Sequence, residues 1–241
     1  MNNYEFCVTY AVSNLPKGGR MLDYGCGDGA IVKLARAKDL DAYGCDVFYE
    51  GCDHSKSLDE KDFGDTIFRM QDGRIPFDNN SFDLVTNNQV LEHVENLDHV
   101  VAEIARVLKP GGIVLSLFPD RGVWREGHCG VPFLHWFPKG SRFRVNYAHA
   151  ARLAGIGYNK GAKPPRKWAE NFCQWLDDWT YYRSYAEIHR TFARHLSQPH
   201  HLEAEWMVAR IGKSATLLPA WLRTAIAKKY GHITFEVRKP R

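Results

Sequence analysis

The chain has 241 residues, of which 44% are hydrophobic and 25% are charged, and this composition excludes disordered, collagen-like and coiled-coil proteins. No apolar run approaches the roughly 20 residues of a membrane span, and the first residues lack the basic and apolar regions of a signal peptide. The net charge of +4 is too small to indicate a class of partner, and six cysteines without a C-x-x-C pair predict free thiols in a cytoplasmic protein.

The first half of the chain alternates short apolar runs with amphipathic segments. The apolar runs predict strands at residues 20–25, 41–47, 65–70, 81–87 and 113–118. Apolar residues at helical spacing predict helices over residues 29–38 and 97–108. Because strands that alternate with helices form parallel sheets, we expect an α/β fold with helices on the faces of the sheet.

The pattern changes after Pro119, where regular spacing is lost. Residues 120–170 hold glycine, proline and basic residues without a clear period, as is typical of a lid or a binding insertion. Regular elements return as a helix at 182–196, a strand at 202–210, a helix at 218–229 and a strand at 232–237. We interpret these last elements as the far half of the same sheet rather than as a second domain.

Charge is distributed unevenly along the chain. Residues 1–120 carry a net charge of −9, whereas residues 121–170 carry +8 and residues 171–241 carry +5. The 121–170 segment also holds eight aromatic residues, which together with its basic residues suit an anionic or sugar-bearing partner. A solvated basic surface over a small aromatic core explains the same composition, and the apolar stripe over residues 168–182 fits either a core or a homodimer face.

Residues 23–29, Asp-Tyr-Gly-Cys-Gly-Asp-Gly, connect a predicted strand to a predicted helix. Glycines at such a junction let the backbone turn tightly and let a ligand approach it closely. Asp46 lies at the end of the second predicted strand, where a carboxylate can accept hydrogen bonds from both ribose hydroxyls of a nucleoside. These residues therefore predict a cofactor that contains a nucleoside.

Two types of cofactor fit this turn. Gly25, Gly27 and Ala30 match the G-x-G-x-x-G/A pattern of dinucleotide sites, which leaves NAD and an oxidoreductase open. Asp23 would repel a pyrophosphate but attract a cationic amino-acid group, and Gly29 extends the pattern to G-x-G-x-G. These two features favour a cofactor that joins a nucleoside to an amino acid.

Five ordered segments resemble the class I S-adenosylmethionine-dependent methyltransferases, in the group that includes ubiquinone and small-molecule methyltransferases. The segments are the glycine turn at 23–29, Asp46, residues 71–83, residues 91–94 and the Leu-Lys-Pro-Gly-Gly run at 108–112. The resemblance covers roughly residues 18–118 of the chain. It implies S-adenosylmethionine as the cofactor and a doubly wound, Rossmann-like sheet of seven mostly parallel strands, with an antiparallel last strand.

The resemblance also divides the chain and assigns residues to the cofactor. We expect one methyltransferase domain over residues 1–241, with a cofactor-binding half at 18–118, a basic, aromatic lid or substrate insertion at 120–181 and the C-terminal half of the sheet at 182–241. The cofactor-binding residues would be Asp23, Gly25, Gly27, Asp46, Val47, Asp72, Gly73, Asn88 and Gln89. In this assignment Asp46 holds the ribose, Asp72 meets the adenine amino group, and Asn88 lies with Gln89 under the cofactor.

Catalytic residues are expected just after the fifth predicted strand, because substrates meet cofactors at the carboxyl ends of parallel strands. Methyl transfer mainly needs alignment and desolvation, but a hydroxyl acceptor also needs a base. We predict His128, His135 and Tyr147 as catalytic residues, with His149 as a further candidate near the methyl group.

Two groups of side chains raise the question of a metal ion. The loop that contains His128 and His135 has donor atoms, but one short loop does not readily present three ligands. In ubiquinone O-methyltransferases a similar Glu-x-x-Glu-His stretch can hold a divalent cation, whereas here the first position is Gln89. We therefore predict no metal, and we expect Glu92 and His93 to stabilise the junction between a loop and a helix.

These observations predict an S-adenosylmethionine-dependent methyltransferase that acts on a small or medium acceptor. The basic, aromatic insertion favours O-methylation of a sugar, a glycan or an anionic metabolite. Two alternatives stay open besides the oxidoreductase: an RNA methyltransferase that uses the basic insertion, and a non-catalytic protein that only binds the cofactor.

Overall fold

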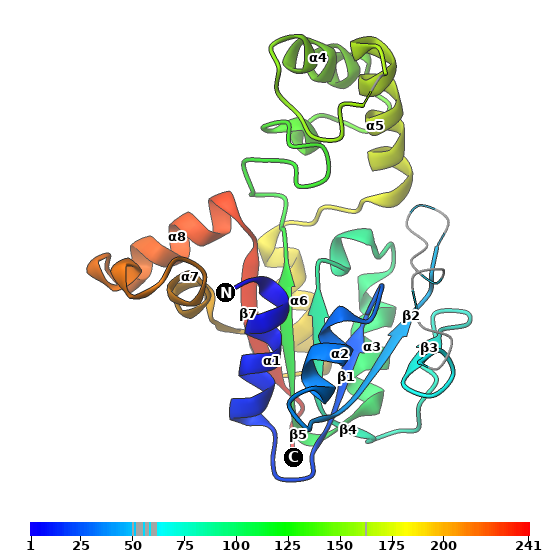
Figure 1. Ribbon diagram of the computed structural model, residues 1–241, viewed down its shortest axis with the longest axis vertical. Coiled ribbons are helices and arrows are strands. Elements are labelled where there is room, and N and C mark those ends of the chain that lie inside the picture. The colour runs from blue at the N-terminus through cyan, green and yellow to red at the C-terminus, as the bar shows by residue number, and fades with distance from the viewer. Residues whose placement is uncertain (50, 52–54, 56–57, 59–61, 162) are drawn as a thin grey trace.

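A seven-stranded sheet forms the centre of the computed structural model, which describes residues 1–49, 51, 55, 58, 62–161 and 163–241 (Figure 1). Across the described residues the strands lie in the order β3-β2-β1-β4-β5-β7-β6. The strands are β1 (Arg20–Tyr24), β2 (Asp41–Asp46), β3 (Ile67–Arg69), β4 (Phe82–Asn88), β5 (Leu108–Phe118), β6 (His200–His201) and β7 (Ile233–Arg238). Strands β1 to β5 pair in parallel and β7 runs antiparallel to β5, which confirms the expected sheet and its antiparallel last strand.

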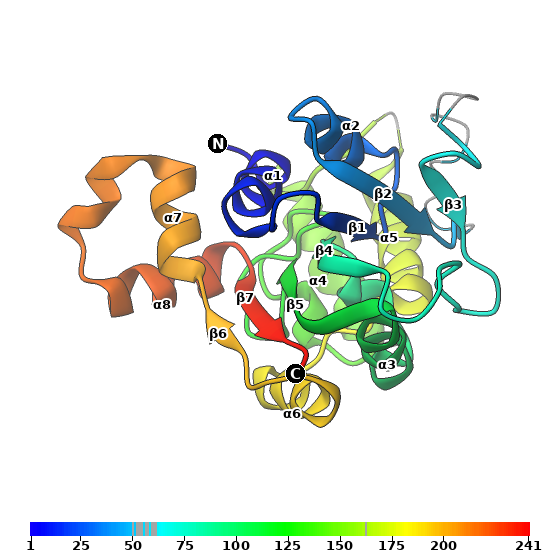
Figure 2. The same cartoon turned by 90° about the horizontal axis from the view of Figure 1, so that it is seen from below.

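Helices cover both faces of this sheet, so the fold is doubly wound (Figure 2). The helices are α1 (Asn3–Asn14), α2 (Ala30–Arg36), α3 (Leu97–Val107), α4 (Arg142–Leu153), α5 (Pro165–Trp179), α6 (Tyr185–His195), α7 (Glu203–Ile211) and α8 (Ala220–Tyr230). Helices α1, α2 and α7 pack on one face, and α3 and α6 pack on the other. Strand β5 contributes side chains to both faces. Leu115 and Leu117 belong to the core under α1, α2 and α7, whereas Val114 and Phe118 belong to the core under α3 and α6. Burial on both faces explains why β5 is largely apolar from Ile113 to Phe118.

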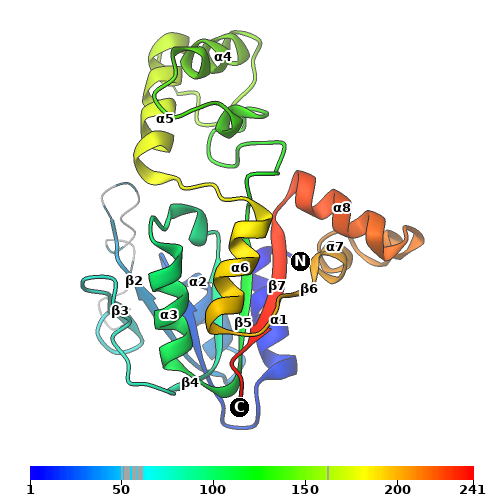
Figure 3. The ribbon, with the colours of Figure 1, turned by 180° about the vertical axis from the view of Figure 1, so that it is seen from behind.

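The chain leaves the sheet after β5 and forms a second layer of helices beyond the carboxyl ends of the strands (Figure 3). Helices α4 and α5 pair there and enclose a hydrophobic core of their own, in which Trp168 is 1% exposed. Cys129, Val131 and Leu134 complete this core from the segment that precedes α4. The apolar stripe predicted over residues 168–182 therefore supplies a core inside the insertion.

One predicted strand is wrong. The strand expected at 202–210 is replaced by α7, and only His200–His201 form the short strand β6. Trp206 and Ala209 of α7, three residues apart, both pack against the sheet, so the apolar spacing of this segment is helical.

Three helices, α1, α4 and α5, lie where no helix or strand was expected, although α5 contains most of the apolar stripe at 168–182. Asn2 and Glu5 form a capping box at the start of α1: the Asn2 side chain accepts the Glu5 backbone N–H at 2.9 Å, and the Glu5 carboxylate accepts the Asn2 backbone N–H at 2.8 Å. Helix α4 lies within residues 120–170, where few apolar residues mark a helical face.

Two further expectations concern free thiols and membrane-spanning segments. Five cysteines are buried free thiols, namely Cys7, Cys26, Cys45, Cys129 and Cys173. Cys52 lies outside the described residues. Within the described ranges, no helix combines the length and the apolar character needed to cross a membrane.

Candidate active site

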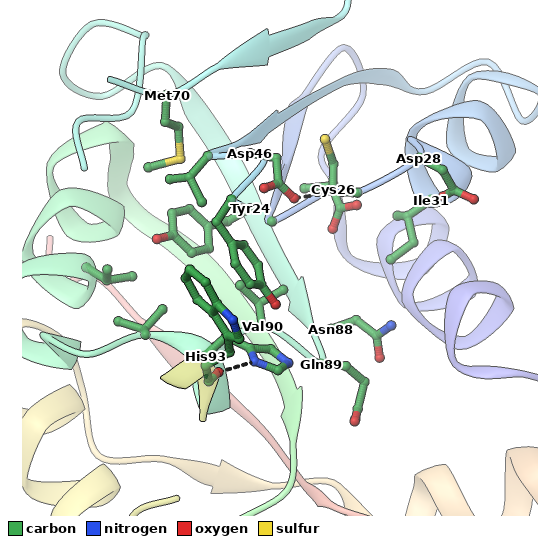
Figure 4. Close-up of a pocket in the computed structure, with 18 of the residues that line it drawn as sticks. Tyr24, Cys26, Asp28, Ile31, Asp46, Met70, Asn88, Gln89, Val90 and His93 are labelled. Atoms are coloured by element: carbon green, nitrogen blue, oxygen red, sulfur yellow. Dashed lines mark hydrogen bonds between the residues drawn. The ribbon is translucent and has the colours of Figure 1, made fainter. Parts of the chain in front are cut away.

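A cavity of about 510 Å³ lies at the carboxyl ends of β1, β2 and β4, where a parallel sheet is expected to bind its ligand (Figure 4). The turn after β1, the end of β2 and the residues after β4 supply most of its lining. Tyr4 of α1 lines another part, and so do Trp179 and Tyr181 at the end of the insertion. The cavity therefore joins the sheet, the first helix and the insertion.

Three glycines of the turn after β1 have left-handed backbone angles that other residues rarely adopt. The angle φ is +73° at Gly25, +53° at Gly27 and +75° at Gly29. A Cβ atom on Gly25 would lie 2.4 Å from a methyl carbon of Val90, which also lines the cavity. Glycine at position 25 therefore lets the turn pass close to the segment after β4.

The Asp46 carboxylate joins the end of β2 to the glycine turn. Its Oδ2 accepts a hydrogen bond from the backbone N–H of Gly27 at 2.9 Å, and its Oδ1 accepts one from Phe48 at 2.8 Å. A carboxylate offers about four acceptor positions, so Asp46 keeps acceptor capacity toward the cavity that it lines. Two adjacent hydroxyl groups, such as those of a ribose, fit this remaining capacity.

Asp23 lines the same cavity from β1, although its side chain is almost completely buried. Burial raises the pKa of Asp23 to about 7, and the nearby Asp46 and Asp28 act in the same direction. The hydroxyl of Thr86, which donates to Oδ1 of Asp23 at 2.9 Å, opposes this shift. A cation placed beside Asp23 would favour its ionised form, so this corner of the cavity suits an ammonium group.

A cluster of acids and histidines adjoins the cavity through His93. The Nδ1 of His93 lies 2.6 Å from the carbonyl oxygen of Trp179, and its Nε2 lies 3.2 Å from Nε2 of His128. The Nδ1 of His128 lies 2.6 Å from Oε1 of Glu126, a fully buried carboxylate. Glu92 completes the group, because its carboxylate, His93 and His128 have ligand atoms within 4.8 Å of one another. Residues that the sequence placed in two separate groups are thus neighbours.

Glu126 is the charged centre of this cluster. Burial would raise its pKa, but hydrogen bonds from His128 and Tyr182, together with the charge of His128, outweigh burial and lower that pKa to about 2. The backbone N–H groups of His128 and Cys129 also donate to Glu126, at 2.9 Å and 2.7 Å. For His128 the directions are reversed: burial would lower its pKa, but the hydrogen bond to Glu126 and the charge of Glu126 outweigh burial and raise that pKa.

The structure does not bring all the predicted catalytic residues to the cavity. His128 adjoins it through His93. His135 is buried in the insertion, outside the lining of the cavity, and burial lowers its pKa to about 4. Tyr147 and His149 lie on α4, whose residues do not line the cavity, so the expectation that they face a methyl group finds no support in this placement.

Eight of the nine predicted cofactor residues line the cavity: Asp23, Gly25, Gly27, Asp46, Val47, Gly73, Asn88 and Gln89. Asp72 is exposed and lies outside this lining, so its contact with adenine stays a prediction. Tyr4, Trp179 and Tyr181 line the cavity without having been predicted. The capping box of α1 offers a signal for Tyr4, whereas no local pattern relates residues 179–181 to the glycine turn.

The sequence matches known methyltransferases over the part that forms the cavity. A family model described as a methyltransferase domain matches residues 22–116. An uncharacterized methyltransferase of Schizosaccharomyces pombe is 29% identical over 193 residues, which cover 73% of this chain and 66% of that protein. The 27-O-demethylrifamycin SV methyltransferase of Amycolatopsis mediterranei is 33% identical over 102 residues, which cover 41% of this chain and 38% of that protein. The matches span less than two thirds of the length of either relative.

A solved structure shares the fold over nearly the whole chain. The S-adenosylmethionine-dependent methyltransferase from Mesorhizobium loti matches with a TM-score of 0.55 and 15% sequence identity, covering 99% of both chains. At this identity the likeness shows the fold alone.

Proposed function

We propose that the chain is a class I, S-adenosylmethionine-dependent methyltransferase, and that it methylates an oxygen atom of a small or medium acceptor. We infer a sugar, a glycan or an anionic metabolite as the acceptor, because residues 121–170 of the insertion, which reaches the cavity through Trp179 and Tyr181, are basic and aromatic. The observation that carries the proposal is that the Asp46 carboxylate and the left-handed glycine turn meet in one cavity.

The residues of the cavity have separate tasks in this proposal. Asp46 accepts hydrogen bonds from the two ribose hydroxyls, and the turn at Gly25 and Gly27 lets the backbone approach the cofactor closely. Asp23 balances the charge of the ammonium group. When bound, S-adenosylmethionine supplies the methyl group from its sulfonium, while the chain supplies alignment and excludes water.

The acceptor is proposed to enter where the insertion meets the cavity. Trp179 and Tyr181 line the cavity from the insertion, and His93 lies beside them. The ring of Trp179 packs on that of Tyr49, with centroids 5.0 Å apart, so this side of the cavity is aromatic and excludes water. Of the three predicted catalytic residues, His128 is the one that this arrangement keeps on the acceptor side.

Calorimetric titration with S-adenosylhomocysteine tests the cofactor part of the proposal. We expect the Asp46→Ala variant to bind at least about 10-fold more weakly than the unmodified chain, a loss of about 1.4 kcal/mol, because two hydroxyl contacts disappear. Asp65→Ala is the matched control, since Asp65 is exposed and lies outside the cavity. Equal affinities of the Asp46→Ala and Asp65→Ala variants would contradict the ribose contact.

An RNA acceptor is the second candidate, favoured by the net charge of +8 over residues 121–170. Part of this charge is used inside the insertion, where Arg144 pairs with Asp177 and Arg166 pairs with Glu170. An RNA methyltransferase would bind tRNA or rRNA with an affinity that falls steeply with salt concentration. A binding titration at low salt that detects no such affinity would remove this candidate.

A further inference from the structure

We propose that Glu92, His93 and His128 bind a divalent transition-metal ion of the Zn²⁺ type at the edge of the cavity. Within the part of the chain that the structure describes, the ligand atoms of these three residues lie within 4.8 Å of one another. The binding of the ion is inferred from this geometry alone, whereas its role rests on the proposed function.

Hydrogen bonds at the two imidazole rings leave a free nitrogen of each ring facing the other. The carbonyl oxygen of Trp179 can only accept, so His93 donates its Nδ1–H there and carries a lone pair on Nε2. His128 donates its Nδ1–H to the Glu126 carboxylate, so in the neutral form of His128 a lone pair remains on Nε2. The two Nε2 atoms lie 3.2 Å apart, and two lone pairs at this separation repel unless a proton or a cation lies between them.

The separation of 3.2 Å also suits an ion that both nitrogens bind. Bonds from zinc to histidine nitrogen are about 2.0–2.1 Å long. With bonds of this length to both Nε2 atoms, the Nε2–ion–Nε2 angle would be about 100°. This is close to the tetrahedral angle of zinc sites.

Glu92 supplies the third ligand. Its side chain is 1% exposed, yet neither of its carboxylate oxygens has a hydrogen-bond partner among the described residues. Burying a carboxylate in this way is costly, and buried charges are generally paired or coordinate a metal. The backbone carbonyl of Glu92 accepts the N–H of Tyr181 at 2.6 Å, which fixes Glu92 beside the returning end of the insertion.

Contacts behind the two histidines match those of known metal sites. A metal-bound histidine almost always donates its other ring N–H to a carboxylate, a backbone carbonyl or water, which orients the ring. Here Glu126 orients His128, and the carbonyl of Trp179 orients His93. The hydroxyl of Tyr182 holds Glu126 in turn at 2.7 Å, so the supporting contacts are in place without the ion.

Two histidines and one carboxylate leave a coordination position for a further ligand, as in catalytic zinc sites. His93 belongs to the lining of the cavity, so we place this position on the cavity side. A hydroxyl oxygen of the acceptor bound there would be held beside the cofactor, and the positive ion would lower the pKa of that hydroxyl. The site thus specifies the substrate class of the proposed function as a hydroxyl compound.

Metal binding is measured on the full chain after treatment with a chelator and dialysis. We expect elemental analysis to find one Zn²⁺ per chain after reconstitution, and Co²⁺ to give the visible absorption of a four-coordinate site. The His128→Gln and Glu92→Gln variants should each weaken Zn²⁺ binding by about 10-fold or more in a competition titration. Glu126→Gln keeps all three ligands but alters the support of His128, and it should weaken binding by about 10- to 100-fold.

His135→Gln is the matched control, because His135 is a buried histidine of the same insertion that lies outside the ligand group. Its affinity for Zn²⁺ should equal that of the unmodified chain. Circular dichroism and S-adenosylhomocysteine binding show whether each variant is folded. Of these variants, His128→Gln should disturb packing least, because the His128 side chain is 26% exposed.

Failure of the metal site and failure of the proposed function give different results. If Zn²⁺ does not bind one to one, or binds folded His128→Gln and Glu92→Gln as tightly as the unmodified chain, the metal site is wrong and the two histidines share a proton. Loss of S-adenosylhomocysteine binding in Asp46→Ala is independent of this outcome. If Zn²⁺ binds as expected and no hydroxyl compound is methylated, the metal site stands and the proposed function fails.

Discussion

The charge of Asp23 depends on what the cavity holds. Burial raises the pKa of this carboxyl group to about 7, far above its ordinary value of 3.8. Between these two values the folded chain keeps a proton that the unfolded chain has lost, so a rise in pH favours the unfolded state. Without cofactor, we expect the free energy of unfolding to fall by up to about 1.4 kcal/mol per pH unit between about pH 5 and pH 7.

Urea unfolding across this pH range, with Asp23→Asn as the comparison, measures the effect. Asparagine keeps an oxygen that can accept the hydrogen bond from Thr86 but has no proton to lose in this range. The variant should therefore lack the part of the pH dependence that the native carboxyl group causes. Identical slopes in the two proteins would show that another group titrates.

Residues that follow a buried strand could be assigned from the sequence, because apolar runs locate the ends of strands. Asp46 and Gly25 were found in this way, and both line the cavity. The contact between His93 and His128 could not be found, since 35 residues separate them and the contact depends on how the insertion folds back. The spacing of residues along the chain therefore predicts a site only where those residues lie on one helix or strand, or at the ends of neighbouring strands.

At the scale of elements, α4 and α5 are joined by an ion pair between Arg144 and Asp177. The Arg144 side chain is 3% exposed, and the second carboxylate oxygen of Asp177 accepts the backbone N–H of Gly140 at 2.7 Å. Arg144→Ala would leave the largely buried Asp177 carboxylate without its counter-charge. We expect the free energy of local opening of α4 and α5 to fall by about 3 kcal/mol.

Native-state hydrogen exchange measures this opening for each amide. Arg142→Ala is the matched control, since Arg142 is an exposed arginine at the start of the same helix. Amides of β4 should exchange equally slowly in both variants, because the change is confined to the insertion. An unchanged rate for α4 and α5 amides in Arg144→Ala would mean that the ion pair does not stabilise the insertion.

A strand that is buried on both faces could be predicted from the sequence. Helices whose packing depends on residues far away in the sequence could not. Residues 113–118 are apolar except for Ser116 because β5 is covered on both sides. The segment at 202–210 fits both a strand and a helix by its apolar spacing, and the packing of Trp206 and Ala209 against the sheet decides for the helix. Helix α4 has a weak apolar face, because its core is completed by residues such as Trp168 of α5.

At the scale of the whole molecule, the insertion returns to the sheet beside the cavity and is fixed there by Arg183. Its Nη2 donates to the carbonyl oxygens of Val94 and Glu95, both at 2.6 Å, and its Nη1 donates to that of Leu91 at 3.3 Å. The N–H of Tyr181 adds a bond to the same segment, which follows β4. The end of the insertion and one wall of the cavity are therefore one connected structure, and a ligand in the cavity should affect both.

Hydrogen exchange with and without S-adenosylhomocysteine tests this connection. We expect slower exchange at residues 23–28, 88–90 and 93–95, which line the cavity from the sheet, and also at Trp179 and Tyr181, which line it from the insertion. Helix α8 lies to the side of the sheet in Figure 1 and contributes nothing to the lining, so its exchange should not change. Protection confined to the sheet segments would show that the insertion opens and closes independently of the cofactor, and that its task is limited to the acceptor.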